Sequence, residues 1–146
     1  MAWLLQGNPA RFALRAYLQS PVVYWLVNRY QAEFALADHL FLWESGPQGG
    51  VVGYGHVIEL PTSRATVRAP HSLGDDLWQT AVPSSDAVVV GIRILLTVHH
   101  GFFVPRHTAR THPVLATLDV LQMAQATVYR CTPAHVVAIM ECGISQ

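Results

Sequence analysis

The feature of this sequence that most constrains its fold is a series of short apolar runs rich in β-branched and aromatic residues. Residues 22–27 read Val-Val-Tyr-Trp-Leu-Val, and residues 40–43 read Leu-Phe-Leu-Trp. Residues of these types favour strands, and the glycines and prolines between the runs favour turns. The pattern therefore predicts a sheet of short strands. The predicted strands are residues 3–6, 22–27, 40–43, 51–58, 87–98 and 127–131.

Glycines indicate how this sheet is shaped. Gly49 and Gly50 separate two of the runs, which predicts a hairpin. Gly53 and Gly55 then fall inside the second strand of that hairpin. Glycine within a strand marks a bend or a close approach of backbone. We therefore expect a sheet that curls into a barrel.

Helices are predicted to be few and short. Asn8 is expected to cap a helix that extends through residues 11–18. Two more are expected, one within residues 104–118 and one opened by Pro133 that ends near Glu141, before Gly143. The fold class is thus α+β. Between these elements, residues 61–85 are interpreted as a long surface loop that carries the isolated Trp78.

Length and composition limit the class of protein. At 146 residues, 51% of them hydrophobic and 12% charged, the chain is predicted to form a single domain spanning residues 1–146. No apolar run is long enough to span a membrane, and no basic segment precedes the first apolar residues, so a cytoplasmic protein is expected. All nine basic residues are arginine and are balanced by nine acidic ones, which disfavours nucleic-acid binding through bulk charge alone.

Metal, cofactor and catalytic patterns are weak. Cys131 and Cys142 lack the paired spacing of a zinc site, and the eight histidines match no known ligand spacing. Ser45 lacks the glycine frame of a nucleophile turn. We therefore expect a binding domain without metal or cofactor and not an enzyme.

Six segments in a fixed order resemble the EVE domain family over nearly the full chain. EVE domains belong to the PUA-like superfamily, a curved β-barrel flanked by short helices, and are similar to the YTH readers of methylated adenine. In bacteria they occur alone or fused to nucleases of modification-dependent restriction systems. The segments are WLLQGNP (3–9), WLVNRY (25–30), FLWESG (41–46), GYGHV (53–57), PRH before HPVL (105–115) and QATVYRCTP (125–133).

The resemblance implies a base pocket. Trp25 falls where YTH readers place a cage tryptophan, and Trp78 is expected to supply the second wall. Asn8 matches a polar residue at the edge of the base. Ser45 and Gly46 match a Ser-Gly pair beside the pocket. Asn28 and Tyr30 belong to the EVE signature itself and complete the predicted base-binding set.

The chemistry of reading a modified base fits these residue types. A flipped base loses stacking and pairing, and each aromatic wall restores roughly 1–3 kcal/mol. Side-chain amides then discriminate at the base edges. Guanidinium groups suit the phosphates, so Arg29, Arg106 and Arg110 are the predicted backbone contacts.

Three functions stay open from the sequence. The first is a reader of 5-methylcytosine, 5-hydroxymethylcytosine or N6-methyladenine in DNA that directs a fused or associated nuclease. The second is an RNA-binding PUA-like module for tRNA or other structured RNA. The third is a small-molecule or protein-interaction module that has lost the base pocket.

Overall fold

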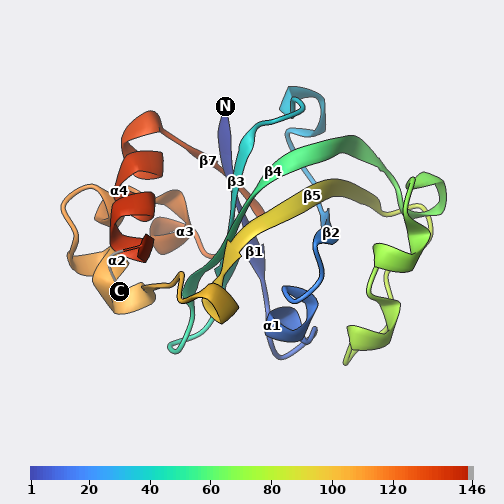
Figure 1. Cartoon of the computed structure of the whole chain (residues 1–146), viewed down its shortest axis with the longest axis horizontal. Helices are drawn as coiled ribbons and strands as arrows, with labels where there is room; N and C mark the ends of the chain where they lie inside the picture. Colours follow the sequence, from blue (N-terminus) through green and yellow to red (C-terminus); the bar gives the residue numbers. More distant parts are fainter. Residues whose placement is uncertain (145–146) are drawn as a thin grey trace.

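A computed structural model describes residues 1–144, and its strands form one mixed sheet (Figure 1). The sheet order is β2-β5-β4-β3-β1-β7, and β6 pairs with β4 beside this path. β1 runs parallel to β3 and antiparallel to β7, whereas the other pairings are antiparallel. The strands are β1 (Ala2–Gly7), β2 (Val22–Leu26), β3 (His39–Glu44), β4 (Gly50–Ser63), β5 (Val88–Thr97), β6 (Val104–Pro105) and β7 (Val128–Cys131).

The prediction of strands and of a hairpin over β3 and β4 is confirmed, but the prediction of a closed barrel is wrong. Within residues 1–144, β2 and β7 are the two ends of the sheet and do not pair with each other. The Arg29 side chain, just beyond β2, reaches β7. Its Nε and Nη2 donate to the backbone carbonyl of Val128 at 2.8 and 2.5 Å. Side-chain hydrogen bonds therefore link the segment after β2 to β7.

The sheet separates two large apolar clusters because alternate residues of each strand point to opposite faces. Trp3 and Leu5 of β1 belong to the cluster on the concave face, here called the inner cluster. Leu4, between them, belongs to the cluster on the other face, here called the helix-side cluster. Further members of the inner cluster are Phe12, Tyr17, Trp25, Leu42, Val57 and Ile92; those of the helix-side cluster are Phe41, Trp43, Phe102, Leu115, Tyr129 and Ile139.

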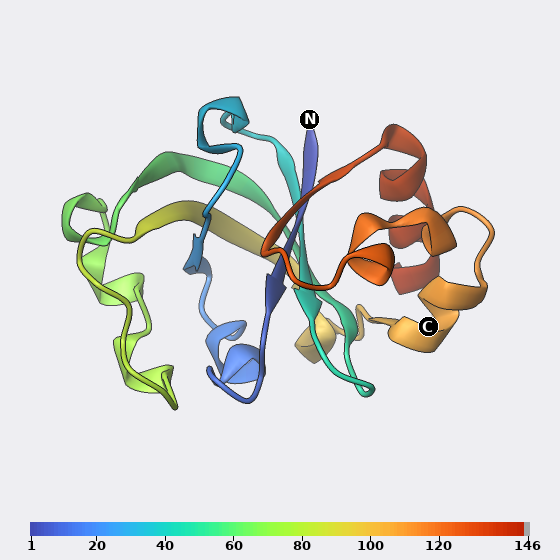
Figure 2. The same cartoon turned by 180° about the vertical axis from the view of Figure 1, so that it is seen from behind.

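The α-helices of residues 1–144 are α1 (Leu14–Tyr17), α2 (Arg106–Thr111), α3 (Asp119–Gln122) and α4 (Pro133–Ile144). α2, α3 and α4 gather at one end of the sheet, beside β7, whereas α1 lies apart from them (Figures 1 and 2). The 3-10 helices are η1 (Gln31–Glu33), η2 (Arg64–Thr66), η3 (Pro70–Ser72), η4 (Asp75–Leu77), η5 (Val98–His100) and η6 (Leu115–Thr117).

Two helix boundaries and one loop differ from the prediction. The Asn8 side chain accepts a hydrogen bond from Ala10 N at 2.9 Å in a local turn, so the first helix begins only at Leu14. The last helix continues past Gly143, because that glycine packs against the Phe102 ring. The predicted loop over residues 61–85 is partly ordered, since β4 extends to Ser63 and three 3-10 helices follow.

No helix within residues 1–144 is long and apolar enough to cross a membrane.

Candidate functional site

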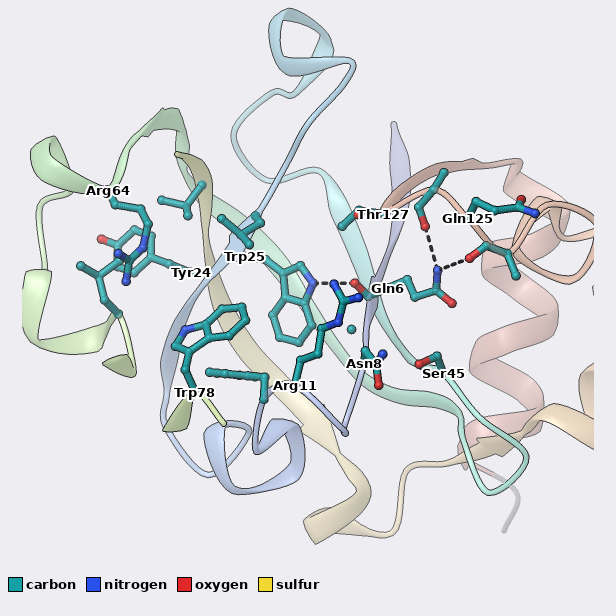
Figure 3. Close-up of a pocket in the computed structure, with 17 residues that line it drawn as sticks. Gln6, Asn8, Arg11, Tyr24, Trp25, Ser45, Arg64, Trp78, Gln125 and Thr127 are labelled. Carbon is teal, nitrogen blue, oxygen red and sulfur yellow. Dashed lines mark hydrogen bonds between the residues drawn. The ribbon is translucent and has the colours of Figure 1, made fainter. Parts of the chain in front are cut away.

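A cavity of about 420 Å³ lies at one end of the inner cluster (Figure 3). This volume falls in the range of roughly 300–1,000 Å³ that is typical of ligand pockets. Its walls come from seven segments of the chain, within residues 6–12, 24–26, 45, 64, 73–78, 89 and 124–127, as expected of a site built by the fold. The lining residues are Gln6, Gly7, Asn8, Arg11, Phe12, Tyr24, Trp25, Leu26, Ser45, Arg64, Leu73, Trp78, Val89, Ala124, Gln125, Ala126 and Thr127.

Trp25 of β2 forms a wall that is fixed in place. Its side chain is only 6% exposed, and its ring lies nearly parallel to that of Tyr17, with centroids 6.4 Å apart. Its Nε1 donates to the carbonyl oxygen of Gln6 at 3.2 Å. Gly7 permits this approach, because a Cβ there would lie 2.7 Å from Cζ2 of the indole. Trp25 therefore presents one face of a rigid ring to the cavity.

Trp78 lines the cavity from a different kind of element. It follows η4 and is half-buried, with its ring 4.7 Å from that of Phe12. Backbone hydrogen bonds hold the segment on both sides, from Ala13 N to Leu77 O at 2.9 Å and from Gln79 N to Arg11 O at 2.8 Å. Trp78 is thus anchored by a short bridge to residues 11–13 and not by a long strand. The two predicted aromatic residues do meet at one cavity.

Polar groups face the tryptophans across the cavity (Figure 3). Asn8 uses its side-chain oxygen within its own turn, which leaves the amide donors available. Among residues 1–144, the hydroxyls of Ser45 and Thr127 and the guanidinium of Arg11 have no hydrogen-bond partner or ion pair. The cavity therefore combines two aromatic rings with donors and acceptors that a planar polar ligand can satisfy.

Gln6 holds the loop that covers the cavity. Its side-chain nitrogen donates to the carbonyl oxygens of Ala124 at 2.9 Å and Ala126 at 2.7 Å. Its backbone nitrogen donates to Thr127 O at 2.8 Å. The same residue accepts the hydrogen bond from Trp25 Nε1. Gln6 therefore connects the aromatic wall to the covering loop.

A second basic residue, Arg64, lies at the end of the cavity near Tyr24. The Arg64 guanidinium is buried, donates to Pro83 O at 2.8 Å and pairs with Asp75. The Tyr24 hydroxyl donates to the Glu59 carboxylate at 2.5 Å. Burial, together with this hydrogen bond, raises the pKa of Tyr24, so its hydroxyl is protonated at neutral pH. Arg64 and Tyr24 thus each have a hydrogen-bond partner within the chain, and both side chains line the cavity.

The structure brings together four of the seven predicted base-binding residues: Trp25, Trp78, Asn8 and Ser45 line the cavity. Three others lie outside the lining. Asn28 is exposed after β2, and Gly46 is in the β3–β4 turn with a φ of +98°. Tyr30 has a φ of +58°, and its ring centroid is 4.0 Å from the guanidinium carbon of Arg130.

The predicted phosphate contacts are in two other places. Arg29 is occupied by the Val128 carbonyl and lies over the rings of Tyr30 and Tyr129. Arg106 and Arg110 are on α2 and line a separate hollow. The cavity arginines that sequence reasoning missed are Arg11 and Arg64. Arg11 lies two residues after the end of the WLLQGNP segment, and this position was the available signal for it.

Within residues 1–144, no cluster of three or more histidine, cysteine or acidic side chains is suitable for a metal ion. Of the two cysteines, Cys131 is buried without a disulfide, and burial raises its pKa to about 12. A thiol of this kind is protonated at neutral pH and is a poor nucleophile.

Comparisons with known proteins give a fold but no family. No family model matches the chain, and no curated protein matches it. Solved structures do match. A hypothetical protein from Leishmania major superposes with a TM-score of 0.72 at 15% identity, over 99% of this chain and 95% of that chain.

Human thymocyte nuclear protein 1 is similar in two structures. Its DUF55 domain gives a TM-score of 0.68 at 14% identity, with 100% of both chains covered. The same protein in complex with DNA that contains 5-methylcytosine gives 0.65 at 11% identity, over 96% of this chain and 95% of that chain. At these identities the likeness establishes the fold alone, which is that of the DUF55 domain, and the sheet of this chain is open.

Proposed function

We propose that this protein is a reader of a modified base in DNA, an EVE-type domain that receives a flipped base in the cavity between Trp25 and Trp78. The observation that carries the proposal is the cavity itself, in which two aromatic rings face unpartnered polar groups. The neighbour with the same fold bound to 5-methylcytosine DNA supports the choice of ligand class. The first candidate base is therefore 5-methylcytosine, followed by 5-hydroxymethylcytosine and N6-methyladenine.

The energetics of the cavity suit base flipping. Extruding a base costs a few kcal/mol, and stacking on two rings returns roughly 1–3 kcal/mol for each. One buried methyl group adds only about 0.8 kcal/mol, which is less than tenfold in affinity. Selectivity therefore depends on the edge groups, namely the Asn8 amide and the hydroxyls of Ser45 and Thr127. A base that leaves these groups unpaired is rejected.

Arg11 is the charged group at this site. It is exposed, lines the cavity and has no acidic partner within residues 1–144. Its place in the lining suits contact with the phosphate of the flipped nucleotide.

The chain itself is a binding domain in this proposal, spans residues 1–146 as one unit and acts in the cytoplasm. A nuclease of a modification-dependent restriction system, fused or associated, carries out cleavage.

The proposal is tested by binding to four matched fluorescent duplexes at two salt concentrations. Each duplex carries one central 5-methylcytosine, 5-hydroxymethylcytosine, N6-methyladenine or no modification. We expect tighter binding to one modified duplex and loss of that preference in Trp78→Ala. Trp25→Phe is the second variant. It is used in place of Trp25→Ala because alanine at this buried position would remove packing. The preference in Arg11→Gln is expected to persist at lower overall affinity.

Two controls make the result interpretable. Arg93→Gln removes the same charge from an exposed position on β5, outside the cavity lining. Urea unfolding of each variant shows that the folded state is retained. Equal, weak and salt-sensitive binding to all four duplexes contradicts the proposal. A structured RNA that binds more tightly than any duplex favours the RNA-binding module instead.

A further inference from the structure

A second hollow, of about 230 Å³, lies outside the base cavity and is lined by Pro47, Arg106, His107 and Arg110. Arg106 and Arg110 are four residues apart on α2, so their side chains lie on the same side of the helix. None of the lining residues is acidic. The hollow is several times larger than the roughly 30 Å³ that one water occupies in the liquid. It therefore has the charge and the room for an anionic group.

Arg106 lacks an internal partner, unlike several other arginines of the chain. Its Nε is buried and has no hydrogen-bond partner within residues 1–144. By contrast, Arg15 pairs with Glu44, Arg64 with Asp75, and Arg29 donates to a backbone carbonyl. A buried charged donor is costly to leave unpaired. An acceptor from outside the chain, such as the oxygen of an anionic group, can satisfy it.

The β3–β4 turn, residues 45–49, joins this hollow to the base cavity. Ser45 lines the cavity, and Pro47 lines the hollow. Because an extended chain spans at most about 3.6 Å per residue, their Cα atoms lie within about 7 Å of each other. In both overall views the turn projects between α1 and α2 (Figures 1 and 2). The two hollows therefore flank one short turn.

Interactions on both sides hold this turn in place. The Arg15 Nε and Nη2 donate to the two carboxylate oxygens of Glu44 at 3.0 and 2.9 Å. On the other side, Arg106 N donates to Gly49 O at 2.9 Å. Gly49 is required here, because a Cβ at this position would lie 1.9 Å from Glu44 O. The separation between the two hollows is consequently fixed by the fold.

We propose that the hollow formed by Pro47, Arg106, His107 and Arg110 binds a backbone phosphate of the strand whose base enters the cavity. This inference rests on the proposed function, since it places the phosphate relative to a bound base. The two hollows flank one turn, so this phosphate is expected close along the strand to the flipped nucleotide. Guanidinium groups bind phosphate oxygens bidentately.

The experiment measures the salt dependence of binding for Arg106→Gln/Arg110→Gln. For duplex DNA, log K falls with log salt by about 0.9 for each phosphate contact. We expect the slope to become shallower by about 0.9 or more in the double variant. Affinity for modified and unmodified duplexes is expected to fall by the same factor, since phosphates carry no sequence information. Arg68→Gln/Arg93→Gln, with the same charge change at exposed positions, is expected to retain the slope.

The outcomes separate this inference from the proposed function. A preference for a modified duplex together with an unchanged slope in the double variant overturns the phosphate site and leaves the base cavity standing. A shallower slope without any preference for a modified duplex overturns the base cavity, and with it the placement of the phosphate beside a flipped base. No binding of the wild type to any duplex or RNA overturns both. Should the double variant fail to fold, Arg110→Gln alone, an exposed residue, gives the same readings.

Discussion

The inner cluster and the helix-side cluster are both well buried, but they are covered in different ways. α4 covers the helix-side cluster so closely that a Cβ on Gly143 would lie 2.3 Å from the Phe102 ring. The open end of the inner cluster is covered by short bridges and loops, among them the segment that carries Trp78 and the loop held by Gln6. A helix seated on a glycine leaves no room beneath it. Loops held at a few points leave the cavity of about 420 Å³.

The largest effect is expected when one aromatic ring is removed from the helix-side cluster, and this loss is compared with removal of a ring at the cavity. Phe102→Ala deletes a ring from the tightly covered cluster, so we expect the free energy of unfolding to fall by about 3–5 kcal/mol. Trp78→Ala removes a half-buried ring at the cavity rim and is expected to cost less than half as much. Urea unfolding gives both values. They can be compared if the m-value, the dependence of the unfolding free energy on urea concentration, is the same in the variants as in the wild type. Equal losses would mean that Trp78 is a core residue and not a cavity wall.

The next effect concerns Asp38, a buried carboxylate beside the inner cluster. Burial acts to raise the pKa of Asp38, but hydrogen bonds from Trp3 Nε1 and Ala35 N, both at 2.9 Å, bring it below the ordinary 3.8. A lowered folded-state pKa gives stability that is present above the unfolded value and lost as pH falls through the folded value. Asp38→Asn is expected to lower the free energy of unfolding by about 1.5–3 kcal/mol at pH 7. Below pH 3.8, the free energy of unfolding of the variant is expected to fall less steeply with decreasing pH than that of the wild type, and this region is called the acid limb.

The measurement for Asp38 is urea unfolding across acidic pH. Glu141→Gln, an exposed residue of α4, is the matched control. If Asp38→Asn leaves the acid limb as steep as in the wild type, other carboxylates cause the acid sensitivity.

A smaller effect is expected from the residue that holds the covering loop. Gln6→Met keeps the length of the side chain but removes both donors to Ala124 and Ala126, at about 0.5–1.5 kcal/mol for each hydrogen bond. Amide hydrogen exchange of residues 124–127 should become faster, while that of α4 does not change. Gln122→Met, which removes one exposed hydrogen bond to Ala116, is the control. Unchanged exchange in Gln6→Met would show that the loop is held by its backbone alone.

The smallest expected effect lies on the helix side, at His135. Burial lowers the pKa of His135 below 6.5. Its Nδ1 accepts from Thr132 N at 3.1 Å, so the neutral ring is the form that fits. Stability from the neutral ring is present above the unfolded pKa and lost as pH falls toward the folded one. His135→Gln should lessen the loss of stability below pH 6.5. If the variant and the wild type lose stability identically with falling pH, His135 is not the source of that loss.

The sequence predicts the strands well because each is an apolar run of β-branched and aromatic residues bounded by turn formers. It fails at the first helix, where Asn8 completes a local turn instead of capping a helix. It also fails at sheet closure. The Arg29 side chain, just beyond β2, donates to the carbonyl of Val128 in β7, 99 residues away. Nothing in the local pattern around Arg29 encodes that contact.

The site is predicted in part for a similar reason. Trp25, Trp78, Asn8 and Ser45 are placed by the resemblance, and all four line the cavity. Gln6 was read only as the end of a buried strand, because its bonds to Ala124 and Ala126 cross most of the chain. Asn28 and Tyr30 share a motif with Trp25 but lie beyond the end of β2, where the chain leaves the cavity. Proximity in sequence to a cavity residue did not ensure proximity in space.

The position of β1 in the sheet has a consequence for the order in which this protein acquires its site. β1 lies between β3 and β7, so one of its edges waits for residues 128–131, which follow it by more than 100 residues. Pairings between such distant segments form slowly. Both tryptophans are synthesised long before the loop at residues 124–127 arrives to cover them. Until residues 124–131 have been synthesised, a nascent chain therefore exposes an aromatic surface with no covering loop, and the competence to bind a ligand arises together with β7.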